Sequence, residues 1–247
     1  MFALSGLFQL RLRTKRRRVF TIFVDFKRCF DLIDHYLLWS KLDKLGVSAK
    51  FIRTIRNLYD HSNFTVRTTE GNSSEIPITE GVLQGEILSP LLFSLFTSDM
   101  ETFFRNKGLR GLSINPKDDL LLLQYADDTA ILCYSEGDVQ LKLKTLREYC
   151  DLNGLTVNVQ KTKVMITSKG GRNSRCSFVI RYGTDTVEIV KQYTYLGIIF
   201  TSTGNFNVAA SAIPKKAMSA LGPLWDILWS SRCQSFRKRI RLFEALA

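Results

Sequence analysis

Two apolar runs flank a short acidic turn near the middle of the chain. Residues 120–133 read LLLLQYADDTAILC, and the turn carries Tyr125, Ala126, Asp127 and Asp128. Apolar runs separated by turn-prone residues predict a β-hairpin whose strands are buried on at least one face. Two interpretations of the adjacent carboxylates remain open at this point: a polar loop in solvent, or a pair of oxygen ligands for a hard divalent cation.

Other segments also have the composition of strands. Residues 19–26 (VFTIFVDF) are β-branched and aromatic, which predicts a buried strand that places Asp25 at its C-terminal end. Residues 64–69 and 74–79, separated by a polar turn at 70–73, predict a second hairpin. Further short strands are predicted within 155–167 and over 177–181, 187–190 and 193–200.

Helical spacing of apolar residues predicts at least four helices. The first begins at 31–34 and ends at Gly46, and Ser48 is placed to cap the second. Ser89 and Pro90 supply an N-cap and a first-turn proline for a third helix, whose apolar positions continue to residue 104. A fourth, amphipathic helix covers 139–150 and ends before Gly154. From residue 205 onward the pattern is helical and increasingly basic.

Composition narrows the class of protein. The 247 residues carry 35 Lys and Arg against 23 Asp and Glu, a formal net charge of +12, which favours nucleic acid as a partner over a membrane surface. The basic run at 11–18 is interpreted as a phosphate contact, a nuclear-import signal or a solvated tail.

The five cysteines are scattered without a CxxC pair, and no apolar run approaches the length of a bilayer span. The N-terminal order, apolar and then basic, is the reverse of a secretory signal. We therefore expect reduced thiols in an intracellular protein of the nucleus or cytoplasm, neither secreted nor bound to a membrane.

Three carboxylates can meet if the strand that ends in Asp25 lies beside the hairpin that carries Asp127 and Asp128. Such a cluster is suited to two-metal phosphoryl transfer, with two Mg²⁺ ions about 3.5–4 Å apart. The two histidines, His35 and His61, lack neighbouring ligands at metal-binding spacing and are predicted to be surface or core residues.

Five ordered blocks carry a resemblance to a known family. They are FVDFKRCFD with Asp25 and Phe30, GVLQG followed by LSP, the YADD turn, GLTVNVQKTK, and Tyr195-Leu196-Gly197. Together they resemble the palm of a reverse transcriptase, most closely the non-LTR retrotransposon group, over about residues 18–247. The resemblance implies an α+β fold, with an antiparallel ferredoxin-like palm sheet and helices on one face. It also implies three parts: a basic segment (1–18), the palm (19–200) and the start of a helical thumb (201–247).

The resemblance also implies roles for individual residues. Asp25 and Asp127 match the main ligands of two Mg²⁺ ions, or of Mn²⁺, and Asp128 completes the acidic cluster. Phe30 matches a steric gate against the ribonucleotide 2′-hydroxyl. The remaining matches are nucleotide and template contacts at Gln84 and Gly85, assistance to leaving pyrophosphate by Lys161, packing near the primer end by Tyr125, and a primer-grip hairpin at Tyr195, Leu196 and Gly197. The implied partners are an RNA template, a DNA primer and deoxynucleoside triphosphates; no oligomeric state is implied.

For three of these residues, a purely structural role is an alternative to the functional one. Phe30 also suits an ordinary core phenylalanine, Lys161 a surface lysine, and Tyr125 an aromatic residue that covers the sheet. A nuclease would use similar carboxylates, but it gives no task to Phe30 or Gln84. A retroviral origin fits less well, because no protease or RNase H segment is found.

The chain departs from the family pattern in several places. Fingers blocks are not found before Asp25, the chain stops where a thumb would begin, Leu83 replaces a common proline, and Glu86 replaces a small residue. The sequence therefore supports two hypotheses: RNA-templated DNA polymerisation, or a catalytically inactive truncated remnant that binds nucleic acid. Missing fingers also predict an apolar sheet edge that this chain leaves exposed, with residues 19–26 incompletely covered.

Overall fold

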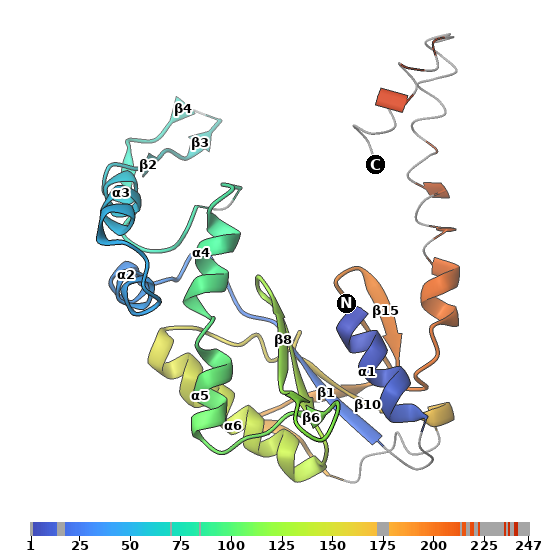
Figure 1. Cartoon of the computed structure of the whole chain (residues 1–247). Coiled ribbons are helices and arrows are strands. Elements are labelled where there is room, and N and C mark those ends of the chain that lie inside the picture. Colours follow the sequence, from blue (N-terminus) through green and yellow to red (C-terminus); the bar gives the residue numbers. More distant parts are fainter. Residues whose placement is uncertain are drawn as a thin grey trace.

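A five-stranded sheet lies at the centre of the computed structural model, which describes residues 2–13, 18–69, 71–83, 85–171, 178–212 and a few positions between 214 and 241 (Figure 1). The strand order is β13-β10-β1-β9-β8. All neighbours are antiparallel except β10 and β13. The strands are β1 (Arg18–Val24), β8 (Leu122–Tyr125), β9 (Asp128–Cys133), β10 (Lys163–Ser168) and β13 (Glu188–Val190).

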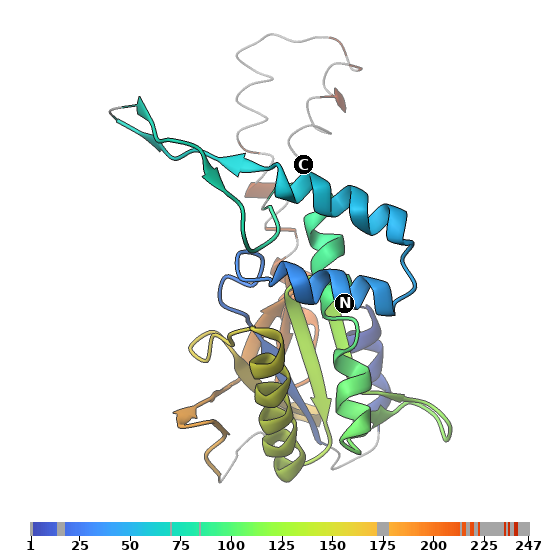
Figure 2. The ribbon, with the colours of Figure 1, turned by 90° about the vertical axis from the view of Figure 1, so that its left-hand side faces the viewer.

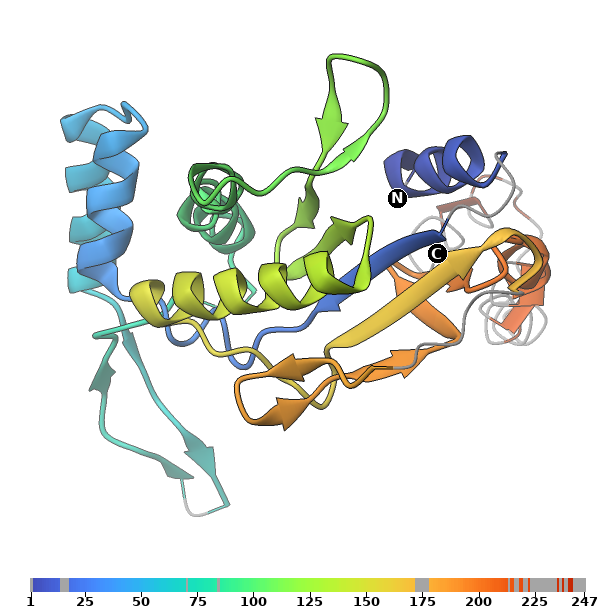
Figure 3. The ribbon, with the colours of Figure 1, turned by 90° about the horizontal axis from the view of Figure 1, so that it is seen from below.

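One face of this sheet is covered by helices. Alternate side chains of β1, namely Phe20, Ile22 and Val24, belong to a core that includes apolar residues of α4 (Ser89–Phe96), α5 (Met100–Asn106) and α6 (Glu136–Asn153). Two further helices, α2 (His35–Lys44) and α3 (Ala49–Asp60), lie outside this layer (Figure 3).

The second face has its own core. Val19 and Phe23 of β1 join buried residues of α1 (Phe2–Leu12) and of the hairpin formed by β14 (Gln192–Tyr195) and β15 (Ile198–Thr201). Phe8 of α1 meets Phe200 edge to face at 5.8 Å. Helix α1 was not predicted, because the apolar N-terminal segment was judged only against signal peptides.

The predicted exposure of the strand at 19–26 is wrong. β1 is the middle strand of the sheet, and Val19–Val24 are at most 2% exposed, with Phe26 at 7%. Helix α1 supplies cover that the sequence analysis expected from outside this chain.

Helix ends agree with most of the predicted capping signals. The Leu37 amide donates to the Asp34 carboxylate at 2.7 Å before α2, and the Phe51 amide donates to the Ser48 hydroxyl at 3.3 Å before α3. Helix α6 ends at Gly154, whose φ of 66° is left-handed. These three boundaries are confirmed.

The predicted third helix is instead two helices, α4 and α5. Lys41 of α2 donates to the Phe96 carbonyl at 2.8 Å and thereby satisfies an acceptor at the end of α4. Ser89 was also misassigned as an N-cap, because it is the first residue of α4 and its hydroxyl donates to the Leu83 carbonyl at 2.5 Å.

The remaining strands are short. β2 (Asn63–Phe64) pairs with β5 (Ile76–Pro77) and β3 (Arg67–Thr68) with β4 (Gly71–Asn72), which confirms the second hairpin as a projecting ribbon (Figure 2). β6 (Leu112–Ser113) pairs with β7 (Asp119–Leu120), and β11 (Arg181–Tyr182) with β12 (Asp185–Thr186); η1 (Lys169–Gly171) is a 3₁₀ turn.

Two predictions fall partly on residues that are not described. Residues 207–212 are helical, but most of the thumb-like region predicted for 201–247 lies outside the described residues, as do 14–17 of the basic run. Cys29, Cys133 and Cys150 are buried free thiols. Within the described residues no helix is long and apolar enough to cross a membrane.

Lys142 of α6 is a fully buried cation beneath the sheet. Its ammonium donates to the Asp138 carboxylate at 2.9 Å and to the carbonyls of Leu132 and Arg110 at 2.6 and 2.7 Å. All three donors of the ammonium are thus satisfied, which is the condition for tolerating a buried charge.

Removal of Asp138 will therefore test this part of the core. We predict that Asp138→Ala lowers the free energy of unfolding by about 3–5 kcal/mol, because it leaves an uncompensated buried charge. The exposed pair Lys107–Glu148 is the control, and Glu148→Ala will cost much less, because water already solvates and screens both charges. Urea denaturation of both variants measures the difference, and equal losses would contradict the assignment.

Candidate active site

The register between β1 and β9 brings two of the predicted carboxylates together. Val24 pairs with Thr129, so the next positions outward, Asp25 and Asp128, lie opposite each other at the ends of the two strands. Strand alternation places Asp25 on the face of Phe23, which is the second face. Residues directly opposite in an antiparallel pair have Cβ atoms about 4.5–5.5 Å apart. The predicted juxtaposition of these two segments is confirmed.

Asp127 completes this acidic rim from a tight turn. Tyr125 pairs with Asp128, which leaves Ala126 and Asp127 as a two-residue loop with Ala126 at a φ of 51°. Asp127 is exposed, whereas Asp128 and Asp25 are half-buried. The hairpin is therefore neither a wholly solvated loop nor a wholly buried one.

The electrostatics of the rim are unfavourable without a cation. Burial raises the pKa of the Asp128 carboxyl, and the neighbouring charges of Asp127 and Asp25 raise it further. None of the three carboxylates forms an ion pair with a residue that the structure describes. Their oxygen donors and uncompensated charge fit a hard divalent cation.

The side chains are nevertheless not gathered into a ready-made metal site. Across the described ranges, no group of three or more His, Cys, Asp or Glu is placed to hold a metal ion. The fit to a cation therefore rests on donor type and charge, and the ligand roles of Asp25, Asp127 and Asp128 stay predictions.

A loop fixes the backbone of Asp25. The Asp25 amide donates to the Thr162 hydroxyl at 3.1 Å, and the Asn158 amide donates to the Asp25 carbonyl at 2.8 Å. Lys161 lies in the same loop with an exposed side chain, and its role at the site stays a prediction. Thr162, fully buried, was not singled out from the sequence; a hydroxyl after a strand pattern gives no signal of its partner.

Phe30 and the glycine block are joined by their backbones. The Val82 amide donates to the Phe30 carbonyl at 2.6 Å, and the Phe30 ring lies 5.0 Å from the Phe93 ring. Phe30 is partly buried and packs against the core on the helix-covered face, as the core interpretation predicts, and its gate role stays a prediction. Gly85 is exposed with a φ of 92°, and Gln84 lies outside the described residues.

Gly81 is needed for this junction. Its φ is 81°, and a Cβ there would lie 2.6 Å from the Asp31 carbonyl oxygen. The ring nitrogen Nε2 of His35 hydrogen-bonds the Gly81 carbonyl at 2.7 Å. His35 therefore anchors the glycine block to the turn that follows Asp25.

The predicted primer-grip residues lie beneath the acidic rim. Tyr195 is buried, and its hydroxyl lies 3.4 Å from the carbonyls of both Leu123 and Asp128, one on each strand of the hairpin. Burial, with the nearby charge of Asp128, raises the pKa of Tyr195 to about 12. Leu196 and Gly197 have φ values of 49° and 77° and form the two-residue turn between β14 and β15.

Two tyrosines near the acidic rim, Tyr125 and Tyr193, differ from what the sequence predicted. Tyr125 is 69% exposed at the hairpin end, so the interpretation that it covers the sheet is wrong. Tyr193 was missed; its ring stacks on Phe23 at 4.2 Å, and the charges of Asp128 and Asp25 help burial to raise its pKa. An aromatic residue in a predicted strand gives no signal of its stacking partner, so the sequence does not reveal the contact of Tyr193 with Phe23.

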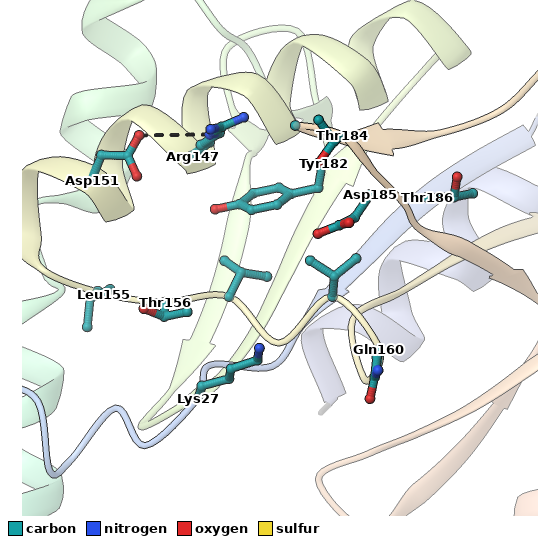
Figure 4. A pocket seen from close by; sticks show the side chains of 13 residues that line it. Lys27, Arg147, Asp151, Leu155, Thr156, Gln160, Tyr182, Thr184, Asp185 and Thr186 are labelled. Atoms are coloured by element: carbon teal, nitrogen blue, oxygen red, sulfur yellow. Dashed lines mark ion pairs between the residues drawn. The ribbon is translucent and has the colours of Figure 1, made fainter.

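A polar cavity of about 620 Å³ lies between α6 and the loop at residues 155–160, on the helix-covered side of the sheet. Tyr182 extends across it, with Lys27, Arg147 and Gln160 around it (Figure 4). The acidic residues that line it are Asp151 and Asp185, and none of the three rim carboxylates is among the lining residues. The acidic rim is thus not part of this cavity.

Solved structures establish the class of fold. Telomerase from Candida tropicalis, in complex with a TWJ fragment of telomeric RNA, aligns with a TM-score of 0.56 and 18% identity over 83% of this chain and 32% of that chain. Apo telomerase truncated from its C-terminal domain gives 0.55 and 16%, over 82% of this chain and 38% of that one. At this identity the likeness concerns the fold alone, and it confirms the predicted α+β polymerase palm.

The sequence identifies the family within that class. Residues 4–200 match the reverse transcriptase (RNA-dependent DNA polymerase) family, and the chain belongs to this family. The Popillia japonica R2 retrotransposable-element polyprotein is 30% identical over 202 residues, and the Drosophila melanogaster jockey polymerase 29% over 181. These matches cover 78% and 71% of this chain but only 32% and 19% of those proteins. The predicted resemblance to the non-LTR group is confirmed.

The raised pKa of Asp128 predicts a pH dependence of stability. The folded protein binds the Asp128 proton more tightly than the unfolded chain, so stability falls as pH rises from the ordinary carboxyl range through the raised pKa. We predict that Asp128→Asn is more stable than wild type at neutral pH and shows a shallower decline. Urea denaturation with a chelator, from about pH 4 to pH 8, measures this. A wild-type advantage at neutral pH would contradict the prediction.

Proposed function

We propose that this chain is the palm of a retrotransposon reverse transcriptase and that it carries out RNA-templated DNA polymerisation by two-metal nucleotidyl transfer. The observation that supports this most directly is the placement of Asp25 opposite Asp128, beside Asp127, at one open rim of the sheet. The net charge of +12 suits a polyanionic substrate.

Asp25, Asp127 and Asp128 would hold the divalent cations, Mg²⁺ or Mn²⁺. When bound, such ions polarise the primer 3′-hydroxyl and neutralise charge on the triphosphate and departing pyrophosphate. The carboxylates fix the position of this charge because β1, β9 and the Asn158–Thr162 turn hold their backbones.

Other residues would position the substrates. Phe30 and Gly85, with Gln84, would contact the deoxynucleoside triphosphate and template, and Lys161 would assist the departing pyrophosphate with its charge. Exposed Tyr125 and the turn at Leu196 and Gly197 would hold the DNA primer; Tyr195, being buried, would act on the turn from below.

Primer extension tests the proposed chemistry. With a poly-A template, an oligo-dT primer and labelled thymidine triphosphate, Asp127→Asn will lose more than about 100-fold of the incorporation rate, because even outer-shell partners of metal ligands cost 10–100-fold. Asp118→Asn, an acid on the loop between β6 and β7, is the matched control and will retain activity. Template binding without Asp127-dependent incorporation would instead support the catalytically inactive, nucleic-acid-binding alternative.

Selection of the sugar tests the role of Phe30. We predict that Phe30→Val raises the ratio of ribonucleotide to deoxynucleotide incorporation by about 10-fold or more, because a smaller side chain leaves room for the 2′-hydroxyl. Phe93→Leu, which changes the ring that Phe30 contacts, controls for loss of packing. Competition between labelled ribo- and deoxyribonucleotides measures the ratio, and an unchanged ratio in Phe30→Val would remove the gate role.

A further inference from the structure

Helix α3 is the outermost helix of the α2–α3–α4 stack (Figure 1). It packs on α2, and α2 packs on α4, which separates α3 from the sheet (Figures 1 and 2). Its buried residues are Ile55 and Tyr59, with Ile52 partly buried on the same side. A helix that buries so narrow a stripe leaves a broad face in solvent.

The centre of that face is polar and carries two cations, and the Thr54 hydroxyl in it donates to the Lys50 carbonyl at 3.0 Å. At 100° per residue, Lys50, Arg53, Thr54 and Asn57 lie opposite the buried stripe, and all four are exposed. They line one open surface depression together with Arg56 and Asp60, which pair with each other at 3.7 Å. Neither Lys50 nor Arg53 forms an ion pair with any described residue.

The stability of the helix does not account for this arrangement. Lys50 occupies the first turn, which holds no acidic residue, and the last turn holds no basic one. The helix macrodipole favours the reverse order by about 0.3–1 kcal/mol per charge. An anionic partner on this face would offset the unfavourable position of the Lys50 charge in the first turn.

We infer that this α3 face, defined by Lys50, Arg53, Thr54 and Asn57, binds the phosphate backbone of a nucleic-acid duplex. The four residues form a rigid row about 10 Å long, because Lys50 and Asn57 are separated by seven helical rises of about 1.5 Å. A duplex presents phosphates in a fixed array, whereas an unpaired strand loses conformational entropy when it is ordered on a rigid surface.

The chain also connects this face to the proposed site. Helix α3 leads directly into the ribbon of β2–β5, and the ribbon returns at Gly81 beside the turn after Asp25. The inference rests on the proposed function for the presence of nucleic acid, and it adds a contact outside the acidic rim.

The salt dependence of duplex binding tests the inference. The double variant Lys50→Gln, Arg53→Gln is compared with wild type by fluorescence anisotropy, with a labelled mixed-sequence DNA duplex as the probe. Loss of two phosphate contacts reduces the slope of log K against log salt by about 1.8. The affinity advantage of wild type will therefore shrink about tenfold between about 50 and 200 mM salt.

Two further variants separate position from charge. Lys117→Gln with Lys144→Gln makes the same change in net charge, at the β6–β7 loop and on the exposed side of α6, and will keep the wild-type slope. The charge-preserving swap Lys50→Arg, Arg53→Lys will also keep it. An unchanged slope in the Gln variant, or an equal fall in the control, overturns the inference.

A parallel titration with unpaired RNA distinguishes the type of strand. A loss confined to that RNA overturns the duplex assignment. The proposed function is tested separately, by Asp127-dependent incorporation in primer extension. Absence of that incorporation would not affect the interpretation of the anisotropy measurement.

Discussion

The antiparallel register of β1 against β9 sets which side chains enter each core and where the acidic residues lie. It places Asp25 opposite Asp128 and turns both toward the second face of the sheet. A slip of one residue would move one carboxylate to the helix-covered face, because successive side chains point to opposite sides. Cores on both faces oppose such a slip, since Phe20 and Ile22 fit beneath helices while Val19 and Phe23 fit beneath α1 and the β14–β15 hairpin.

The buried charge of Lys142 is compensated within the protein, whereas the charges of the acidic rim are not compensated by any described residue. Lys142 is buried but has Asp138 and two carbonyls as partners, so its charge is compensated inside the protein. The rim carboxylates form no ion pair with a described residue, and burial, with the charges of Asp127 and Asp25, raises the pKa of Asp128. Neighbouring backbone contacts hold the rim in place. Its uncompensated negative charge lies where divalent cations would bind in the proposed chemistry.

Local signals predicted the parts of the fold that are decided locally. The β-branched run predicted β1, and Asp34, Ser48 and Gly154 marked helix ends, because capping depends on a few neighbouring atoms. The carboxylates were found through ordered motifs. The sequence did not predict contacts between distant segments. Helix α1 covers one face of the sheet, Lys41 donates to the Phe96 carbonyl at the end of α4, and Tyr193 stacks on Phe23. Each depends on a partner that spacing along the chain does not reveal.

We propose that Asp25 and Asp128, which lie opposite each other at the strand ends, would hold the same divalent cation. Mn²⁺ titration followed by its paramagnetic resonance signal measures this directly in wild type, Asp25→Asn, Asp128→Asn and the double variant. We expect each single substitution to weaken Mn²⁺ binding. We also expect the double variant to lose less binding free energy than the two single variants combined, because the two carboxylates would share one ion. Additive losses, or Mn²⁺ binding that neither substitution alters, would contradict it.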